Sequence, residues 1–223
     1  MPVIKYYKQM GFKLEEMKIL MESNRFDFHA KKLRDKIDEL RRMREEINIA
    51  YTSVNDWYNL IREAEGVLEN HVTEVSVKYI ESITACYRSQ DFSDNYMDAI
   101  INIDWTNYLE TLGHEITGAV HLYFPHFREK LAGKPTKAVI FQKGIGPIDE
   151  SKTRTFGGKM MLAAYHIGPH ESIGDTYQRI AEWADAHGYR PGEGAIERYV
   201  TDYWTTKRSE DFVMEILIDI DKK

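Results

Sequence analysis

Glu197 and Tyr199 are the residues whose types and spacing most suggest a binding site. They belong to the segment AIERYVTDY, residues 195–203, whose alternating pattern predicts a β-strand. A period of two places one set of side chains on a common face: Ala195, Glu197, Tyr199 and Thr201. A carboxylate that is buried without a fixed partner costs stability, so such a group is usually retained for a ligand. The alternative is an exposed Glu197 without a role.

Aromatic side chains favour the functional interpretation. Several lie in segments that we expect to converge around this strand: Tyr123, Phe141, Tyr165, Tyr177, Tyr199, Tyr203 and Trp204. Ring faces attract positive charge and a carboxylate neutralises it, so the combination predicts a site for lipophilic cationic or aromatic small molecules. Many of these rings are expected to be ordinary core. The predicted ligand-binding residues are Glu197, Tyr199, Tyr165, Tyr123, Tyr177, Trp105 and Phe141.

Other chemistries have little support in the sequence. The histidines at 114, 121, 126, 166, 170 and 187 show no compact metal-ligand spacing, so we predict no metal site. No serine lies in a G-x-S-x-G elbow, and Cys86 has no evident histidine partner in sequence. The glycine-rich segments GIGP (144–147) and RPGEG (190–194) are typical of turns. We therefore predict neither catalytic residues nor a cofactor.

Composition limits the class of protein. With 223 residues, of which 43% are hydrophobic, the chain can bury a substantial core. No apolar run approaches the roughly 20 residues that span a bilayer, and the N-terminus lacks a signal-peptide pattern, so we predict a cytoplasmic protein that does not enter the membrane. Residues 1–70 carry 13 basic and 13 acidic side chains, so the net charge of −6 lies entirely in the remainder. An acidic domain repels phosphate backbones, which makes residues 71–223 a poor DNA-binding surface.

The elements that would position the site begin with helices. Residues 3–22 predict two short helices separated at Gly11. Residues 27–64 contain neither proline nor glycine and predict one long helix. Apolar residues recur along it at heptad spacing: Leu33, Leu40, Ile47, Val54 and Ile61, with Ile37, Tyr51 and Tyr58 at the second position. Such a seam favours a homodimer through residues 27–64, although it could instead pack on its own domain, and Arg44 interrupts the second position.

The rest of the chain predicts an α+β domain. A strand at 73–88, interrupted near Glu81 and Ser82, precedes a helix at 94–112 and strands at 118–124 and 136–142. The second half repeats this order with a strand at 159–166, a helix at 171–187 and strands at 195–203 and 212–219. Two βαββ units that cannot bury their sheet faces separately predict one domain with pseudo-twofold symmetry.

Two segments resemble parts of MerR-type transcription regulators. The run MGFKLEEMKILM (10–21) is similar to the end of their winged-helix head, which leads into a dimer helix. Residues 74–223 resemble the GyrI-like effector-binding domain of multidrug-sensing members, above all in AAYHIGPHESIGDTYQRIAEWADAHGYRPG (163–192) and the following E-x-Y strand. The resemblance implies a head remnant at 1–24, a coiled-coil dimerisation helix at 25–68 and a GyrI-like domain at 71–223.

The resemblance also implies a function. In that family the E-x-Y glutamate is the buried acid of the ligand pocket, which corresponds to Glu197 with Tyr199 beside it. The helix-turn-helix and wing that begin a MerR-type head are missing from this sequence. We therefore expect the ligand-sensing part of a transcription regulator that contacts DNA only in a full-length form.

Two alternatives belong to other classes. Some relatives of this fold resemble small hydrolases, in which Glu197 would act as general base and Tyr199 or Tyr165 as proton donor. Stand-alone relatives suggest a module that binds a DNA enzyme such as gyrase. Turnover that Glu197 controls would favour the first alternative, and protein capture without small molecules would favour the second.

Overall fold

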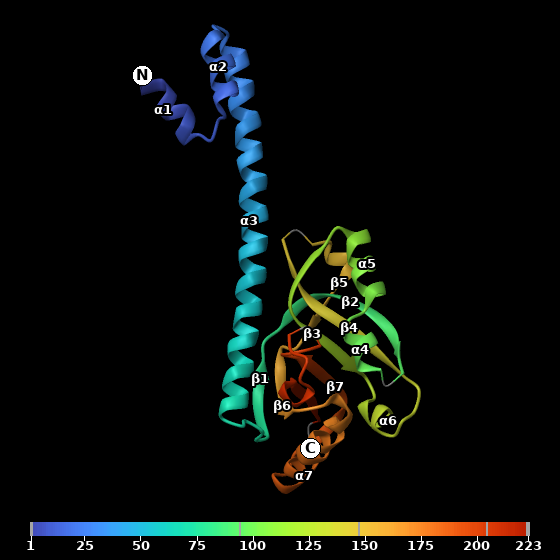
Figure 1. Ribbon diagram of the computed structural model, residues 1–223. Helices are drawn as coiled ribbons and strands as arrows, with labels where there is room; N and C mark the ends of the chain where they lie inside the picture. Colours follow the sequence, from blue (N-terminus) through green and yellow to red (C-terminus); the bar gives the residue numbers. More distant parts are fainter. Residues whose placement is uncertain (1, 94, 147, 204, 222–223) are drawn as a thin grey trace. The chain divides into compact units, whose positions relative to one another are not determined.

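A computed structural model describes residues 2–221 of the chain, except 94, 147 and 204 (Figure 1). The chain forms two compact units, residues 1–50 and 51–223, and the long helix α3 (Phe26–Glu69) contributes to both. None of the described helices is long and apolar enough to cross a membrane.

The N-terminal unit contains α1 (Pro2–Gln9), α2 (Leu14–Glu22) and the first part of α3. Gly11, with φ +78°, lies between the two short helices, which confirms the predicted break. Phe12, Met17 and Leu20 form a small buried cluster. Lys36 of α3 pairs with Glu39 at 2.6 Å, and its ammonium lies 5.0 Å from the centre of the Phe12 ring. The pair of short helices therefore depends on α3 for its core.

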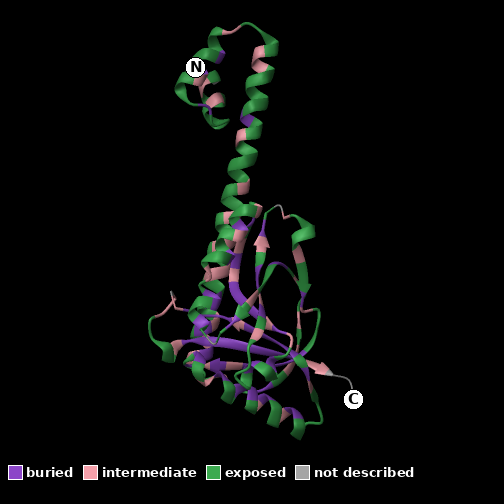
Figure 2. Cartoon of the chain, turned by 90° about the vertical axis from the view of Figure 1, so that its right-hand side faces the viewer, coloured by how far each residue is buried: buried purple, intermediate pink, exposed green. Residues whose placement is uncertain are grey.

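Helix α3 is continuous across the predicted span and extends beyond it to Glu69, since Gly66 alone does not end it. The eight residues of the heptad stripe are 37–70% exposed in the single chain: Leu33, Ile37, Leu40, Ile47, Tyr51, Val54, Tyr58 and Ile61. Figure 2 shows long exposed stretches on this helix. The stripe is therefore available to a partner.

Among the described residues, eight antiparallel strands form one sheet in the order β1-β6-β8-β7-β3-β4-β2-β5. Their bounds are β1 Ser76–Ile80, β2 Ile83–Phe92, β3 Glu115–Phe124, β4 Thr136–Ile145, β5 Thr153–Phe156, β6 Lys159–Ile167, β7 Arg190–Tyr199 and β8 Val213–Asp221. The order is symmetric about the central β7–β3 pair, as two βαββ units in one domain require. The interruption at Glu81 and Ser82 is also confirmed, and it separates β1 from β2, which lie on opposite sides of the sheet centre.

Four helices follow or interrupt the strands: α4 (Tyr96–Ile100), α5 (Ile103–Leu112), α6 (Phe127–Leu131) and α7 (Ile173–Ala186). Short 3₁₀ turns occupy Glu150–Lys152, His170–Ser172 and Ser209–Asp211. The helix predicted at 94–112 is divided because Asn102 begins a new one. Its side-chain oxygen accepts a hydrogen bond from the Trp105 backbone N–H at 2.8 Å.

Two local predictions around β7 are wrong. The segment RPGEG (190–194), expected to be a turn, is the first half of β7, and the strand ends at Tyr199 rather than at residue 203. Pairing with β8 continues on both sides of a bulge between Pro191 and Ala195, so sheet hydrogen bonds outweigh the local turn preference. Thr201 and Tyr203 therefore lie beyond the strand, and Trp204 lies outside the described residues.

The sheet has two different faces. Helices α4 to α7 cover the first, which we call the helix-covered face and which buries the main core with Leu122, Tyr177 and Tyr199. The second, which we call the α3 face, packs Val200 and Val213 against the last turns of α3. Because side chains alternate along each strand, consecutive residues of β7 contribute to opposite faces.

Candidate functional site

Glu197 lies in β7 on the helix-covered face and has no exposed surface. Its carboxylate accepts hydrogen bonds from the hydroxyls of Tyr177 at 2.7 Å and Tyr199 at 2.8 Å. It also forms an ion pair with the ammonium of Lys130, whose side chain is only 2% exposed. Burial raises the pKa of both tyrosines well above the usual value, so both remain hydrogen-bond donors to this carboxylate.

Aromatic rings surround the Lys130 ammonium. Its nitrogen lies 4.6 Å from the ring centre of Phe124, 5.0 Å from Tyr96 and 5.5 Å from both Phe92 and Tyr177. We call these four rings with the Glu197 carboxylate the cation cage. Ring faces and a carboxylate stabilise a desolvated positive charge, so the cage is chemically suited to a lipophilic cation.

Sequence reasoning missed Lys130. It lies in the segment PHFREKLAGKP, where alternating charges at the end of a strand are typical of a solvated loop. The short helix α6 places Lys130 and Phe127 on its buried side, while Arg128 hydrogen-bonds to the carbonyl oxygen of Gly192 at 2.9 Å. No period within five residues identifies such a helix, so the local sequence offers no signal for the burial of this lysine.

His170 extends the polar cluster. Its ring stacks on Tyr96 at 5.1 Å between centroids, and its Nδ1 lies 3.0 Å from the hydroxyl of Tyr203. Burial lowers the pKa of His170 to about 4, so the ring is neutral near neutral pH, and its Nε2 has no hydrogen-bond partner among the described residues. A neutral imidazole next to the cage adds a polar nitrogen atom. Because it carries no positive charge, it does not compete with a cation for the Glu197 carboxylate.

The structure brings together only some of the predicted ligand-binding residues. Glu197, Tyr199 and Tyr177 contact one another, and Trp105 belongs to the same core but donates its indole N–H to Gln142 at 3.0 Å. Three others lie on the α3 face, on the far side of the sheet: Tyr123, Phe141 and Tyr165. The expectation that all these rings converge is wrong, because side chains alternate along each strand and the strand register places these three rings on the face opposite Glu197.

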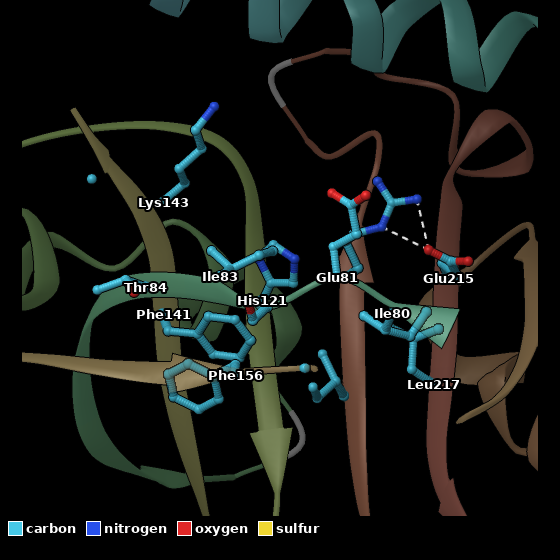
Figure 3. A pocket seen from close by; sticks show the side chains of 15 residues that line it. Ile80, Glu81, Ile83, Thr84, His121, Phe141, Lys143, Phe156, Glu215 and Leu217 are labelled. Carbon is cyan, nitrogen blue, oxygen red and sulfur yellow. Dashed lines mark hydrogen bonds and ion pairs between the residues drawn. The ribbon is translucent and has the colours of Figure 1, made fainter. Parts of the chain in front are cut away.

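The α3 face carries a cavity of about 510 Å³ (Figure 3). His121, Phe141 and Phe156 lie together in its wall, with Phe141 stacked on Phe156 at 3.7 Å and on His121 at 4.5 Å. Burial, together with the nearby Arg198 guanidinium, lowers the pKa of His121 to about 3, so this ring is neutral. The cavity thus combines a neutral imidazole with stacked apolar rings.

The charged side chains of Arg198, Glu215, Glu63 and Lys78 beside this cavity are paired with one another. Arg198 donates to Glu215 at 2.8 Å and also pairs with Glu63 of α3, while Lys78 pairs with Glu215. Tyr165 donates its hydroxyl to Glu63 at 2.7 Å. These pairs join β1, β7 and β8 to α3 beside the cavity.

Cys86 does have a histidine neighbour, which sequence reasoning missed. Its sulfur lies 3.4 Å from Nδ1 of His114, and Nε2 of the same ring accepts a hydrogen bond from the Asp149 backbone N–H at 3.0 Å. An imidazole that accepts at Nε2 carries its proton on Nδ1, so this ring cannot take the thiol proton. Burial also raises the pKa of Cys86, which disfavours the reactive thiolate.

Among the residues described, no group of three or more His, Cys, Asp or Glu side chains could hold a metal ion.

Comparison with known proteins finds a family model that matches part of the sheet and solved structures that share the fold. Residues 134–221, from near the start of β4 to the end of β8, match the family model of the GyrI-like small molecule binding domain. This confirms the GyrI-like domain and the α+β fold expected from the sequence. No curated protein shows significant sequence similarity to the chain.

Among solved structures, the chain is similar to EcmrR in a complex with DNA, with 16% identity and a TM-score of 0.56, over 99% of this chain and 81% of that chain. It is also similar to the C-terminal domain of EcmrR, with 18% identity and a TM-score of 0.56, over 68% of this chain and 99% of that one. These two similarities show a shared fold. A hydrolase from Listeria innocua aligns with 8% identity and a TM-score of 0.46, over 67% and 93% of the chains, which carries no functional argument.

Proposed function

We propose that this chain is the ligand-sensing part of a MerR-type transcription regulator and that it binds lipophilic, cationic or aromatic small molecules in the cation cage. The observation that carries the proposal is a fully buried carboxylate that already holds a positive charge among four aromatic rings. A protein interior disfavours charge unless it is paired, so a site of this composition selects molecules that combine a cation with apolar surface.

The assignment to regulation rests on the domain class and on the fold. The matched family is a small-molecule-binding domain, and EcmrR, whose fold the chain shares, is seen in a complex with DNA. Residues 71–223 carry the whole net negative charge, so we place any DNA contact outside this domain. Ligand binding regulates such a protein only when the affinities for its two states differ.

The hydrolase alternative fits this site poorly. A general base needs a free lone pair that can reach a proton of the substrate. Glu197 accepts hydrogen bonds from two tyrosine hydroxyls and pairs with an ammonium, and none of these donors is exposed to solvent. The same arrangement suits a carboxylate that stabilises a bound cation.

Glu197→Gln tests the site, and Glu215→Gln is its matched control. Both glutamates are almost completely buried and paired with a lysine, but Glu215 serves the α3 face. The probes are 4-hydroxyphenyltrimethylammonium and its uncharged isostere 4-tert-butylphenol, titrated by calorimetry. We expect Glu197→Gln to weaken the cation at least about tenfold and the neutral phenol less than about twofold, because only the cation loses an ion pair.

The control separates the two candidate sites. If Glu215→Gln weakens binding and Glu197→Gln does not, the ligand occupies the cavity on the α3 face and the cage assignment is wrong. Equal weakening of the cation and the phenol by Glu197→Gln would remove the ion-pairing claim.

A further inference from the structure

The cation cage is not empty, because the chain fills it with its own side chain. The Lys130 ammonium makes the contacts expected of a bound cation, namely an ion pair with Glu197 and four ring faces within 5.5 Å. We infer that Lys130 is a tethered substitute for the ligand, so that the ligand is a lipophilic monocation that exchanges with this ammonium. The inference rests on the proposed function and adds the residue that sets its charge specificity.

The charge balance fixes the class of ligand. With Lys130 in place, the charge of Glu197 is neutralised, and a neutral ligand that displaced Lys130 would leave this carboxylate buried and unpaired. Removing one partner of a buried ion pair is strongly destabilising. A dication would add an uncompensated charge in the same place. Only a single positive charge on an apolar body restores both the ion pair and the ring contacts.

The element that carries Lys130 is short and borders open space on two sides. Helix α6 has only five residues, and two cavities flank it. The larger, of about 690 Å³, is lined by His126 and Glu129 and reaches Phe92. The smaller, of about 220 Å³, is lined by Arg128 and Leu131 and reaches Tyr177. Two rings of the cage therefore border space into which a ligand can enter.

The polar contacts that hold α6 over the cage are few. Arg128 donates to the carbonyl oxygens of Gly192 at 2.9 Å and Pro191 at 3.1 Å, and His126 lies 2.8 Å from a carboxylate oxygen of the exposed Glu193. All three partners lie in the first half of β7, before the residues that pair with β3. Loosening these contacts would let α6 move while Glu197 and the cage rings on β2, β3 and α7 stay in position.

Because Lys130 is attached to the chain, the strength of its competition with a free ligand can be estimated. A group held on a short flexible link competes at an effective concentration in the millimolar range. Lys130→Met removes the competing charge and keeps the apolar stem. We therefore expect this variant to bind 4-hydroxyphenyltrimethylammonium at least about tenfold more tightly than the wild type, with little change for 4-tert-butylphenol. The cation should also raise the melting temperature of Lys130→Met more than that of the wild type, because it restores the missing partner of Glu197.

Two further variants keep the test decisive if Lys130→Met folds poorly. Lys130→Met combined with Glu197→Gln has no buried charge and should show no preference for the cation over the phenol. Arg128→Ala leaves the ion pair intact but releases α6 from β7, so it should tighten cation binding several-fold. The matched control is Arg88→Ala, which removes a comparable bond from a guanidinium to a backbone carbonyl, that of Asp104, away from α6.

The outcomes distinguish this inference from the proposed function. Cation binding that depends on Glu197 but is no tighter in Lys130→Met and Arg128→Ala would overturn the tethered cation and leave the sensor site standing. If neither the wild type nor any variant binds the cation, both are overturned. Tighter binding in Lys130→Met that disappears in the double variant supports both.

Discussion

Glu197 and Glu215 show how the same residue type takes different roles on the two faces of one sheet. Both are buried acids on neighbouring strands, and both pair with a lysine. Glu215 also binds Arg198, which bridges it to Glu63 of α3, so it belongs to a structural network that joins the sheet to the helix. The partners of Glu197 are instead two tyrosines and a lysine inside a ring of aromatic side chains. At the scale of single residues, burial is therefore common to both glutamates, and the identity of their partners is what distinguishes the proposed ligand site.

The buried ring of His121 makes the stability of the protein depend on pH. Its pKa of about 3 lies below the ordinary value of 6.5, so the folded state keeps the ring neutral while the unfolded chain takes up a proton. Its contribution to stability is complete above about pH 6.5 and is lost as the pH falls towards 3, by about 1.4 kcal/mol per pH unit. His121→Gln should therefore show a shallower loss of unfolding free energy between pH 6 and pH 4, measured by urea denaturation.

The control is His187→Gln at an exposed position at the end of α7. It shows what a histidine-to-glutamine change at an exposed position does to the unfolding free energy at each pH. An unchanged slope in His121→Gln would show that this ring is protonated in the folded protein, against the burial described above.

At the scale of elements, the β1–β2 connection forms one wall of the cavity on the α3 face, and Gly157 of the adjoining turn sets its geometry. Gly157 has φ +80°, and an added Cβ would lie 2.3 Å from the carbonyl oxygen of Glu81. Gly113, which ends α5, has φ +63° with no neighbour near the added atom. A side chain added at Gly113 would therefore cause backbone strain alone, whereas one added at Gly157 would cause both backbone strain and steric overlap.

Alanine should therefore lower the free energy of unfolding less at Gly113 than at Gly157. Gly113→Ala meets only the left-handed backbone penalty, so we expect a loss of about 1 kcal/mol of unfolding free energy. Gly157→Ala adds overlap with a backbone atom that cannot rotate away, which raises the expected loss to roughly 2–4 kcal/mol. Chemical denaturation of both variants checks the order. Equal losses would mean that the connection at residues 80–84 is free to move.

At the scale of the whole molecule, the exposed stripe on α3 is the largest feature that a single chain leaves without an explanation. Aliphatic and tyrosine side chains at heptad spacing face solvent over most of the helix. A second copy of the same helix would bury this stripe, which is the homodimer that the spacing predicts. In a regulator, such a dimer would connect the two sensor domains. Ligand binding could then change how these two domains are placed relative to each other.

Ile47→Asp combined with Val54→Asp should abolish the dimer, because each places a carboxylate in the seam. The matched control is Asn48→Asp with Asn55→Asp, which adds the same charges one residue further along at exposed positions. Sedimentation should give the wild type and the control roughly twice the chain mass of 26.1 kDa, and the seam variant a single chain mass. A wild-type protein that sediments as a single chain would refute the coiled-coil prediction.

The sequence by itself determined the long helix and the order of the main strands and helices in the two βαββ units, because these depend on periodicities that local residues carry. It also selected Glu197, since the alternation of β7 separates its two faces correctly. It did not determine the length of β7 or the secondary structure of RPGEG (190–194). In that segment, pairing with β8 outweighs a local preference for a turn.

Only the tertiary structure decided which residues share a site. It placed Tyr123, Phe141 and Tyr165 on the face opposite Glu197, because that depends on the register between strands distant in sequence. It also brought Lys130 to Glu197, 67 residues further along the chain. No pattern near either residue contains this contact, since a five-residue helix has too little periodicity to show its buried side. The carboxylate was therefore visible in the sequence, whereas the charge that occupies its site was not.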